Sequence, residues 1–539
     1  MSSSTVIDVF GHILYSFTRG VTDHYNPDEP EFTEESFGYS PLESTGREWY
    51  LHPVEELIYQ EYSDREATSL DYLASYSFNI EIHDASSIEE STNTPETHQN
   101  DSITMAWRRL RPCIQRTILK SMYFGALISL LTSLLVGMIY TLVSYISFRT
   151  IHICQYHPLH STSLQVQWMR SMSDVVGCAF LYIWFFALLN FLFRPFQLRG
   201  VKRKLFVVCL ITYLLDTIYR VALQALGISH SYVSYPVKFP LNALFLINQC
   251  LQVHFLTRCI CTSARKKIRA KLFFKMIVPS CFSFLSFFLV ASLIYPAYNK
   301  ADVDKKLLIA TFAPLVGVVV KVTSRICVQT LYNITHPGYS YVLLSPLYCG
   351  SAIVFRVLQA DLGSLYSIAI LGIIHGAAEV IERSTMVFID HICHMLRKRK
   401  SAPWGSFRTP RRERLMADIA IMSMLYESTA IVSVNGFLYL YQFVYLKGES
   451  FVNLLQSFAI HTSVSLAIEW VFNSVSLAIE TRYQNMPVMA IWRRRWKRHI
   501  LVAIVNAVPM ALWTSTNLLD ILHGRFTEIS TEPCKMPFT

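Results

Sequence analysis

The chain has 539 residues, of which 52% are hydrophobic and only 16% are charged. Its mean hydropathy is positive, which argues against a soluble domain or a nucleic-acid-binding protein and favours an integral membrane protein. The charge is divided unevenly: residues 1–104 carry 21 acidic and 3 basic side chains, a net of −18, which leaves 45 basic and 17 acidic ones afterwards, a net of +28.

The first 104 residues are rich in Glu, Asp, Ser and Thr, and their low hydrophobicity and negative charge predict a largely disordered region. A short exception is Val6–Phe17, whose apolar residues recur with helical spacing and predict a small amphipathic helix. No cleavable signal peptide is recognisable, so we expect the first membrane helix to act as a signal anchor.

Long apolar segments begin at Leu119, and each is close to the roughly 20 residues that a helix needs to cross a bilayer. The sequence therefore predicts an all-α, polytopic bundle of about eleven transmembrane helices within residues 105–523, followed by a short tail, 524–539. The predicted segments are 119–147, 174–193, 205–227, 239–261, 272–295, 307–332, 340–360, 363–392, 415–446, 451–480 and 499–522.

Lys and Arg cluster before the first predicted helix and after the second, fourth, eighth and tenth. All these clusters fall on one side if eleven helices alternate, which predicts a cytoplasmic N-terminus and a non-cytoplasmic tail by the positive-inside rule. The plasma membrane and the endomembranes both fit this arrangement. The sequons at Asn100 and Asn333 should then be cytoplasmic and unglycosylated.

Ionisable residues lie within three consecutive apolar segments. His375, Glu379 and Glu382 share one face of the eighth predicted helix, Glu427 lies in the middle of the ninth, and Glu469 lies in the tenth. Charged groups at membrane depth normally face a protein interior or an aqueous cavity, and consecutive helices are usually neighbours. These patterns predict an acidic interior between the three helices.

Two interpretations of this acidic interior stay open. In the first, it forms a path for a cation or proton, with the carboxylates assisted by two histidines; its candidate residues are Glu379, Glu382, Glu427, Glu469, His375 and His461. In the second, the carboxylates are neutral or pair with Arg383, Arg356, Lys321 or Arg325 and hold the helices together. Asp216 and Arg220, spaced i, i+4, are interpreted as a structural ion pair.

Transport or ion permeation is therefore the first hypothesis for function. The alternative is a membrane-embedded acyl- or glycosyl-transferring enzyme that uses His375 as a general base, and a receptor or scaffold is the third. No cofactor is predicted. No metal site is predicted either, since neither helix has the second histidine that an HEXXH zinc site requires. The oligomeric state is left open.

Two further features lie at the predicted membrane surfaces. One short segment combines basic side chains with two indoles, which favours contact with anionic lipid headgroups of the inner leaflet. Its members are Trp492, Arg493, Arg494, Arg495 and Trp496. On the opposite side, Cys154 and Cys534 are the cysteines that lie clear of the membrane, and an oxidising compartment would allow them to form a disulfide bond.

Overall fold

The computed structural model describes residues 114–525, with gaps at 155–161, 194–197, 199, 228–234, 261–265, 332–334, 336–337, 361–364, 399–409, 446–449, 483, 485 and 487. All the secondary structure in this described part is helical, as the sequence predicts. The acidic region 1–104, both sequons and Cys534 lie outside the described residues, so the predictions made for them are not tested here.

The described helices follow one another along the chain with short connections. They are α5 (Ile114–Ala126), a π-helical turn (Leu127–Thr132), α6 (Ser133–Thr150), α7 (Leu164–Leu192), α8 (Lys202–Ala225), α9 (Tyr235–Ile260), α10 (Lys266–Leu289), a second π-helical turn (Val290–Ile294), α11 (Tyr295–Asn299), α12 (Val303–Gln329), a 3₁₀ turn η7 (Ser340–Leu343), α13 (Ser345–Ala360), α14 (Leu365–Lys398), α15 (Pro410–Tyr445), α16 (Phe451–Arg482) and α17 (Val488–Arg525).

Seven helical stretches are long and apolar enough to cross a membrane, which is typical of a multi-pass membrane protein. They are Ile114–Thr150, Leu164–Leu192, Lys202–Ala225, Phe239–Ile260, Leu365–Asp390, Arg414–Val444 and Phe451–Arg482. The other four predicted spans coincide with α10, α12, α13 and α17, which are helical but not among the seven. The 16-residue α13 is shorter than a bilayer requires, and α17 begins with a basic segment. The count of eleven spans stays a prediction.

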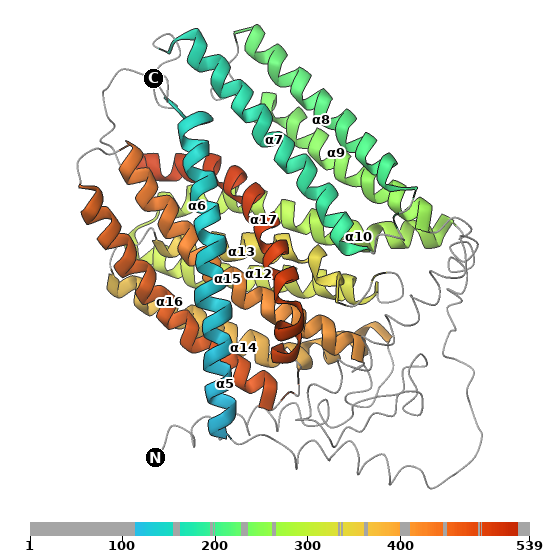
Figure 1. The fold of residues 1–539 in the computed structure, drawn as a ribbon, viewed down its shortest axis with the longest axis vertical. Helices are drawn as coiled ribbons and strands as arrows, with labels where there is room; N and C mark the ends of the chain where they lie inside the picture. The colour runs from blue at the N-terminus through green and yellow to red at the C-terminus, as the bar shows by residue number, and fades with distance from the viewer. Residues whose placement is uncertain are drawn as a thin grey trace.

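Helix α15 lies at the centre of the bundle, and nearly every residue of its membrane-length segment is buried. It packs against α6, α13, α16 and α17, while α7, α8 and α9 pack on one another as a layer that joins the other helices mainly through α17 and α10 (Figure 1). Close approach of the helices depends on small residues: a Cβ atom on Gly137 would lie 2.5 Å from the Cβ atom of Val432. Small residues at helix contacts are the usual means by which membrane helices pack closely.

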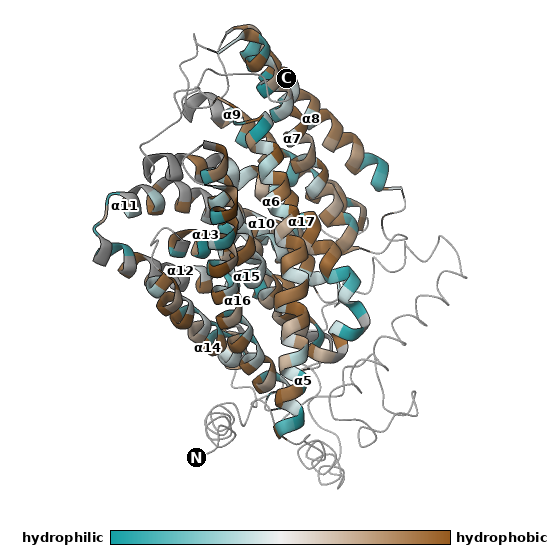
Figure 2. Cartoon of the chain, turned by 60° about the vertical axis from the view of Figure 1, so that its left-hand side comes forward, coloured by the Kyte–Doolittle hydropathy of each residue, from teal (hydrophilic) through white to brown (hydrophobic). Residues whose placement is uncertain are grey.

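The continuous helix formed by α5 and α6 is apolar outside and polar inside. Large apolar side chains such as Leu131, Leu135 and Met138 are more than half exposed, whereas Ser129, Ser133 and other small polar residues are buried. Hydrophobic residues dominate the helices, and hydrophilic ones gather at the start of α5 (Figure 2). An exposed apolar surface of this extent would aggregate in water, and it is expected where lipid is the solvent.

The π-helical turn Leu127–Thr132 interrupts this helix where it meets α16. Within the turn, the Thr132 hydroxyl donates to the Ile128 carbonyl at 2.5 Å, and the Ser133 hydroxyl donates to the carbonyls of Ser129 and Leu130. Hydroxyl groups that bond backward to the backbone satisfy carbonyls freed by the changed helical pitch. The Ser129 hydroxyl of the same turn accepts from the Asn473 amide of α16, at 3.0 Å.

Candidate functional site

Charged side chains from α12, α13, α14, α15 and α16 meet in the middle of the bundle and form what we call the interior charge network. Its members are Lys321, Arg356, Glu379, Glu382, Arg383, Glu427, Glu469 and Glu480. The helices bring them together because α14 packs on α16, α13 and α16 both pack on α15, and α12 lies against α13 and α14.

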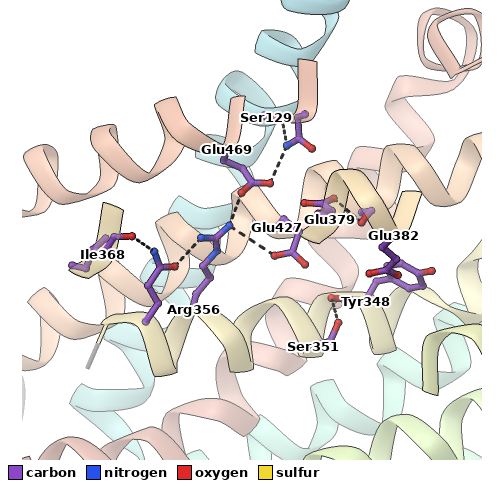
Figure 3. Close-up of polar contacts among 12 residues, drawn as sticks. Ser129, Tyr348, Ser351, Arg356, Ile368, Glu379, Glu382, Glu427 and Glu469 are labelled. Carbon is purple, nitrogen blue, oxygen red and sulfur yellow. Dashed lines mark hydrogen bonds and ion pairs between the residues drawn. The ribbon is translucent and has the colours of Figure 1, made fainter. Parts of the chain in front are cut away.

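Arg356 on α13 joins two of the acidic helices (Figure 3). One terminal nitrogen lies 2.5 Å from Glu469 Oε2 and 4.0 Å from Glu427 Oε2. The other donates to the Gln359 side-chain oxygen at 2.8 Å, and the Gln359 amide donates in turn to the Ile368 carbonyl on α14. Arg356 is 5% exposed, so its charge depends on these neighbours instead of water.

Arg383 on α14 makes a second, two-pronged connection to α16. Its Nε and a terminal nitrogen donate to the two carboxylate oxygens of Glu480, at 2.8 and 2.7 Å, and its other terminal nitrogen donates to Asn473 Oδ1 at 3.1 Å. The Asn473 amide donates to Glu469 as well as to Ser129. Asn473 therefore links the two arginine clusters to each other and to the π-helical turn.

Three carboxylates are held less closely. Glu379 lies 3.7 Å from Arg383 and accepts from the Ser423 hydroxyl at 3.1 Å, Glu382 lies 3.6 Å from Lys321, and Glu427 lies 4.0 Å from Arg356. Their side chains are 13–14% exposed, whereas those of Glu469 and Glu480 are 2% exposed. The network thus contains two kinds of carboxylate: tightly paired ones that are almost unexposed, and loosely paired ones that are slightly exposed.

The network has more negative than positive groups. It contains five carboxylates (Glu379, Glu382, Glu427, Glu469, Glu480) and three cations (Lys321, Arg356, Arg383), a net of −2 when all are ionised. A neighbouring pair on α12 and α14 does not change this balance, because Arg325 is matched by Asp390 at 2.7 Å. Unbalanced charge is costly in a low-dielectric interior, so two positive charges are needed to neutralise the network.

The two histidines predicted to assist are placed apart. The His375 ring packs against Phe355, with ring centroids 5.4 Å apart, at the side of α14 that faces α13. His461 bonds instead to the Tyr439 hydroxyl at 3.0 Å and to the Ser457 carbonyl at 2.8 Å. His461 therefore contacts α15 through Tyr439 and does not touch the network carboxylates through these bonds. A catalytic role for His375 stays a prediction.

The predicted pair of Asp216 and Arg220 belongs to a larger cluster between α7 and α8. Arg220 Nε lies 2.7 Å from Asp216 Oδ2, and a terminal nitrogen of Arg220 also bonds to Asp174 on α7. Asp174 was missed because it is the first residue of the predicted 174–193 segment, where a carboxylate is expected at the membrane surface. In the structure α7 begins at Leu164, which places Asp174 well inside the helix.

The basic and aromatic segment predicted to contact lipid lies on the first turns of α17. Arg493 and Trp496 are exposed, whereas Trp492 is 5% exposed and packs near the His499 ring. Arg495 is half-buried and the side chain of Arg494 lies outside the described residues. Headgroup contact therefore stays a prediction for Arg493 and Trp496, while the indole of Trp492 is directed into the protein.

Cys154, at the end of α6, is disulfide-bonded, and its partner lies outside the described residues. The backbone at Cys154 has φ of 55°, a left-handed conformation that is uncommon for a residue with a Cβ atom. Eight other cysteines in the described part of the chain are free thiols: Cys178, Cys209, Cys250, Cys259, Cys281, Cys327, Cys349 and Cys393. The pairing of Cys154 with Cys534 stays a prediction.

The structure also adds residues that the sequence patterns did not single out as site members. Glu480 ends the second copy of a repeated segment, SVSLAIE at 463–469 and 474–480, and Asn473 lies directly before that copy. Near the basic end of α17, His499 Nε2 lies 3.0 Å from Asp418, which also pairs with Arg414 at 3.0 Å. Asp418 and His499 are fully buried, so they join α15 to α17.

In the part of the chain that the structure describes, no group of three or more His, Cys, Asp or Glu side chains is arranged to hold a metal ion. Comparison of the chain with protein-family models, with curated proteins and with solved structures finds no match. The function of this multi-pass membrane protein is therefore argued from the geometry of its interior.

Proposed function

We propose that this protein moves protons or small monovalent cations across its membrane through the interior charge network. The observation that supports the proposal is the surplus of two carboxylates over cations, gathered in the loosely held set Glu379, Glu382 and Glu427. A permeating cation has to be attracted strongly enough to enter and weakly enough to leave. Carboxylates that already contact a protein cation at 3.6–4.0 Å meet both requirements better than those in close ion pairs.

The roles within the network follow from the distances. Glu469 and Glu480 lie 2.5 and 2.7 Å from arginines and are almost unexposed, so we assign them to holding α13, α14 and α16 together. Glu427 lies between the Arg356 and Glu379 positions in Figure 3, on the central helix α15. We therefore assign the exchange of the transported ion to Glu427 and its two neighbours on α14, Glu379 and Glu382.

Lys321 differs from the two arginines because its ammonium group competes with the transported cation for the loosely held carboxylates. Its Nζ lies 3.6 Å from Glu382 and 5.1 Å from the centre of the Tyr348 ring, a cation–π contact. The ammonium group also interacts electrostatically with Glu427 and Glu379. A lysine that shares three carboxylates without a close bond to any of them can move toward one when an ion occupies another.

The test is flux through the purified full-length protein in liposomes that contain a pH-sensitive dye, with a potassium diffusion potential as the driving force. Sodium and potassium uptake are measured in parallel. Glu427→Gln should keep the fold, because the amide preserves shape and hydrogen bonding, and should reduce flux at least tenfold. The matched control is Glu480→Gln, a change of the same size in the tightly paired set, which should lower stability without abolishing flux per folded molecule.

The purely structural interpretation predicts a different result. If the carboxylates only hold helices together, Glu427→Gln weakens the contact with Arg356 and should lower thermal stability, with no flux in either protein. Absence of proton, sodium and potassium flux through the unmodified protein would reject the proposed function. Unchanged flux through Glu427→Gln would reject the assignment of that residue.

A further inference from the structure

A second polar interior lies in the layer formed by α7, α8 and α9, away from the interior charge network (Figure 1). Three buried polar residues follow one another at four-residue intervals on α8: Thr212, Asp216 and Arg220. They form one polar stripe that extends over two turns of the helix. Ser171 of α7 extends the stripe in one direction by donating to Gln224 at 2.8 Å, and Asn248 of α9 extends it in the other. From Gln224 to Thr212 the stripe covers about 18 Å along the helix axis at 1.5 Å per residue.

On α9, the side-chain amides of Asn248 and Gln252 each have one polar atom that is hydrogen-bonded and one that is not. Asn248 Oδ1 accepts from the Thr212 hydroxyl at 3.0 Å and from the Gln252 amide at 2.9 Å. The Asn248 amide nitrogen and the Gln252 carbonyl oxygen make no hydrogen bond with any residue that the structure describes. Both side chains are 0% exposed. A donor and an acceptor therefore remain unmatched, one turn apart, in the middle of α9.

The Tyr182 hydroxyl of α7 is in the same situation. Its ring packs between Tyr213 of α8 and Phe245 of α9, at centroid distances of 6.0 and 5.6 Å. The side chain is 2% exposed, and within the described residues its hydroxyl has no hydrogen-bond partner. Tyr213 follows Thr212 directly on α8, so the Tyr182 ring lies beside the polar stripe of that helix.

Plain helix packing accounts for only part of this arrangement. Interhelical hydrogen bonds explain the Thr212 contact, but polar atoms left unmatched at membrane depth are expensive, and the unmatched Tyr182, Asn248 and Gln252 atoms come from two helices that share one layer. Buried polar groups of mixed donor and acceptor character are the usual partners of buried water, which makes two to four hydrogen bonds. A charged ligand fits less well, because Arg220 already bonds to both carboxylates of the stripe.

We propose that α7, α8 and α9 hold a file of ordered water molecules that runs from Asp174 to Gln252. At one end, the Asp174 side chain is 21% exposed and provides contact with the surroundings. At the other end, water donates to the Gln252 carbonyl and accepts from the Asn248 amide, and further along it bonds to the Tyr182 hydroxyl. The ligand of this site is water, and the site is separate from the proposed ion path.

The test uses hydroxyl radicals produced by a brief X-ray pulse, which splits water in place and oxidises the side chains beside it. Tyr182 of α7 borders the proposed file and is 2% exposed. The matched reporter is Tyr140 of α6, which is 1% exposed and whose hydroxyl is bonded to Thr514 of α17. Mass spectrometry of the full-length protein in lipid nanodiscs should find Tyr182 oxidised at least fivefold faster than Tyr140.

Two variants connect the labelling to the amides. Gln252→Met and Asn248→Leu keep the overall side-chain shape and remove the groups that hold water, so oxidation of Tyr182 should fall toward the rate of Tyr140. Equal rates for Tyr182 and Tyr140 in the unmodified protein would overturn the proposal, and that comparison needs no variant to fold. Unchanged oxidation of Tyr182 in a folded Gln252→Met protein would overturn it as well.

Discussion

Arg383 provides the most direct test of how the interior charge network stabilises the bundle. Its guanidinium group makes two parallel bonds to Glu480 and one to Asn473, and both charged side chains are 1–2% exposed. Arg383→Met removes three hydrogen bonds and leaves Glu480 as an unpaired buried charge. Breaking one side of such a pair costs about 3–5 kcal/mol of unfolding free energy.

The same contacts predict how much other substitutions should change the free energy of unfolding. Arg383→Lys keeps the charge but loses the fork that fits both carboxylate oxygens, so it should cost about 1–3 kcal/mol. Arg383→Met combined with Glu480→Leu removes both charges, and a coupling energy of about 1–3 kcal/mol should make the double variant more stable than the sum of the single ones predicts. Lys267→Met, a change of an exposed cation on α10, should stay within about 0.5 kcal/mol.

The measurement is reversible unfolding by sodium dodecyl sulfate in mixed detergent micelles, followed by tryptophan fluorescence. All variants are compared at one protein concentration and one lipid content. The reasoning is refuted if Arg383→Met destabilises no more than Lys267→Met, or if the double variant shows no coupling. Either result would mean that Glu480 is neutral or hydrated in the membrane and does not depend on Arg383.

Two other predictions concern packing and covalent structure. Gly376→Ala should lower stability by about 1–3 kcal/mol, because the new Cβ atom would lie 2.6 Å from Phe472 Cγ where α14 meets α16. The control in the same unfolding assay is Gly317→Ala, which should be tolerated because the nearest contact of its new Cβ atom is 3.4 Å. Cys154 should be found in a disulfide-linked peptide with Cys534 when protein from the secretory pathway is digested without reduction; detection of Cys154 as a free thiol, or linked to another cysteine, would contradict the pairing.

The sequence by itself determined the class of the protein. Segments of about 20 apolar residues have few alternatives to a membrane helix, because the backbone polar groups have to be satisfied internally in lipid. It also indicated that the acidic residues of α14, α15 and α16 face an interior, since a carboxylate exposed to hydrocarbon is too costly to keep. Glu379, Glu427 and Glu469 were identified for this reason, from residue type and depth alone.

Only the tertiary structure decided which carboxylates are matched and which are in surplus. Pairing depends on the relative rotation and height of helices, and a helix with apolar residues on every side, such as α16, gives no sequence signal for either. Arg356 pairs with Glu469, and Arg383 pairs with Glu480, because of how α13 and α14 pack on the acidic helices. The same is true of Tyr182, Asn248 and Gln252, whose unmatched atoms become visible only when α7, α8 and α9 are placed side by side.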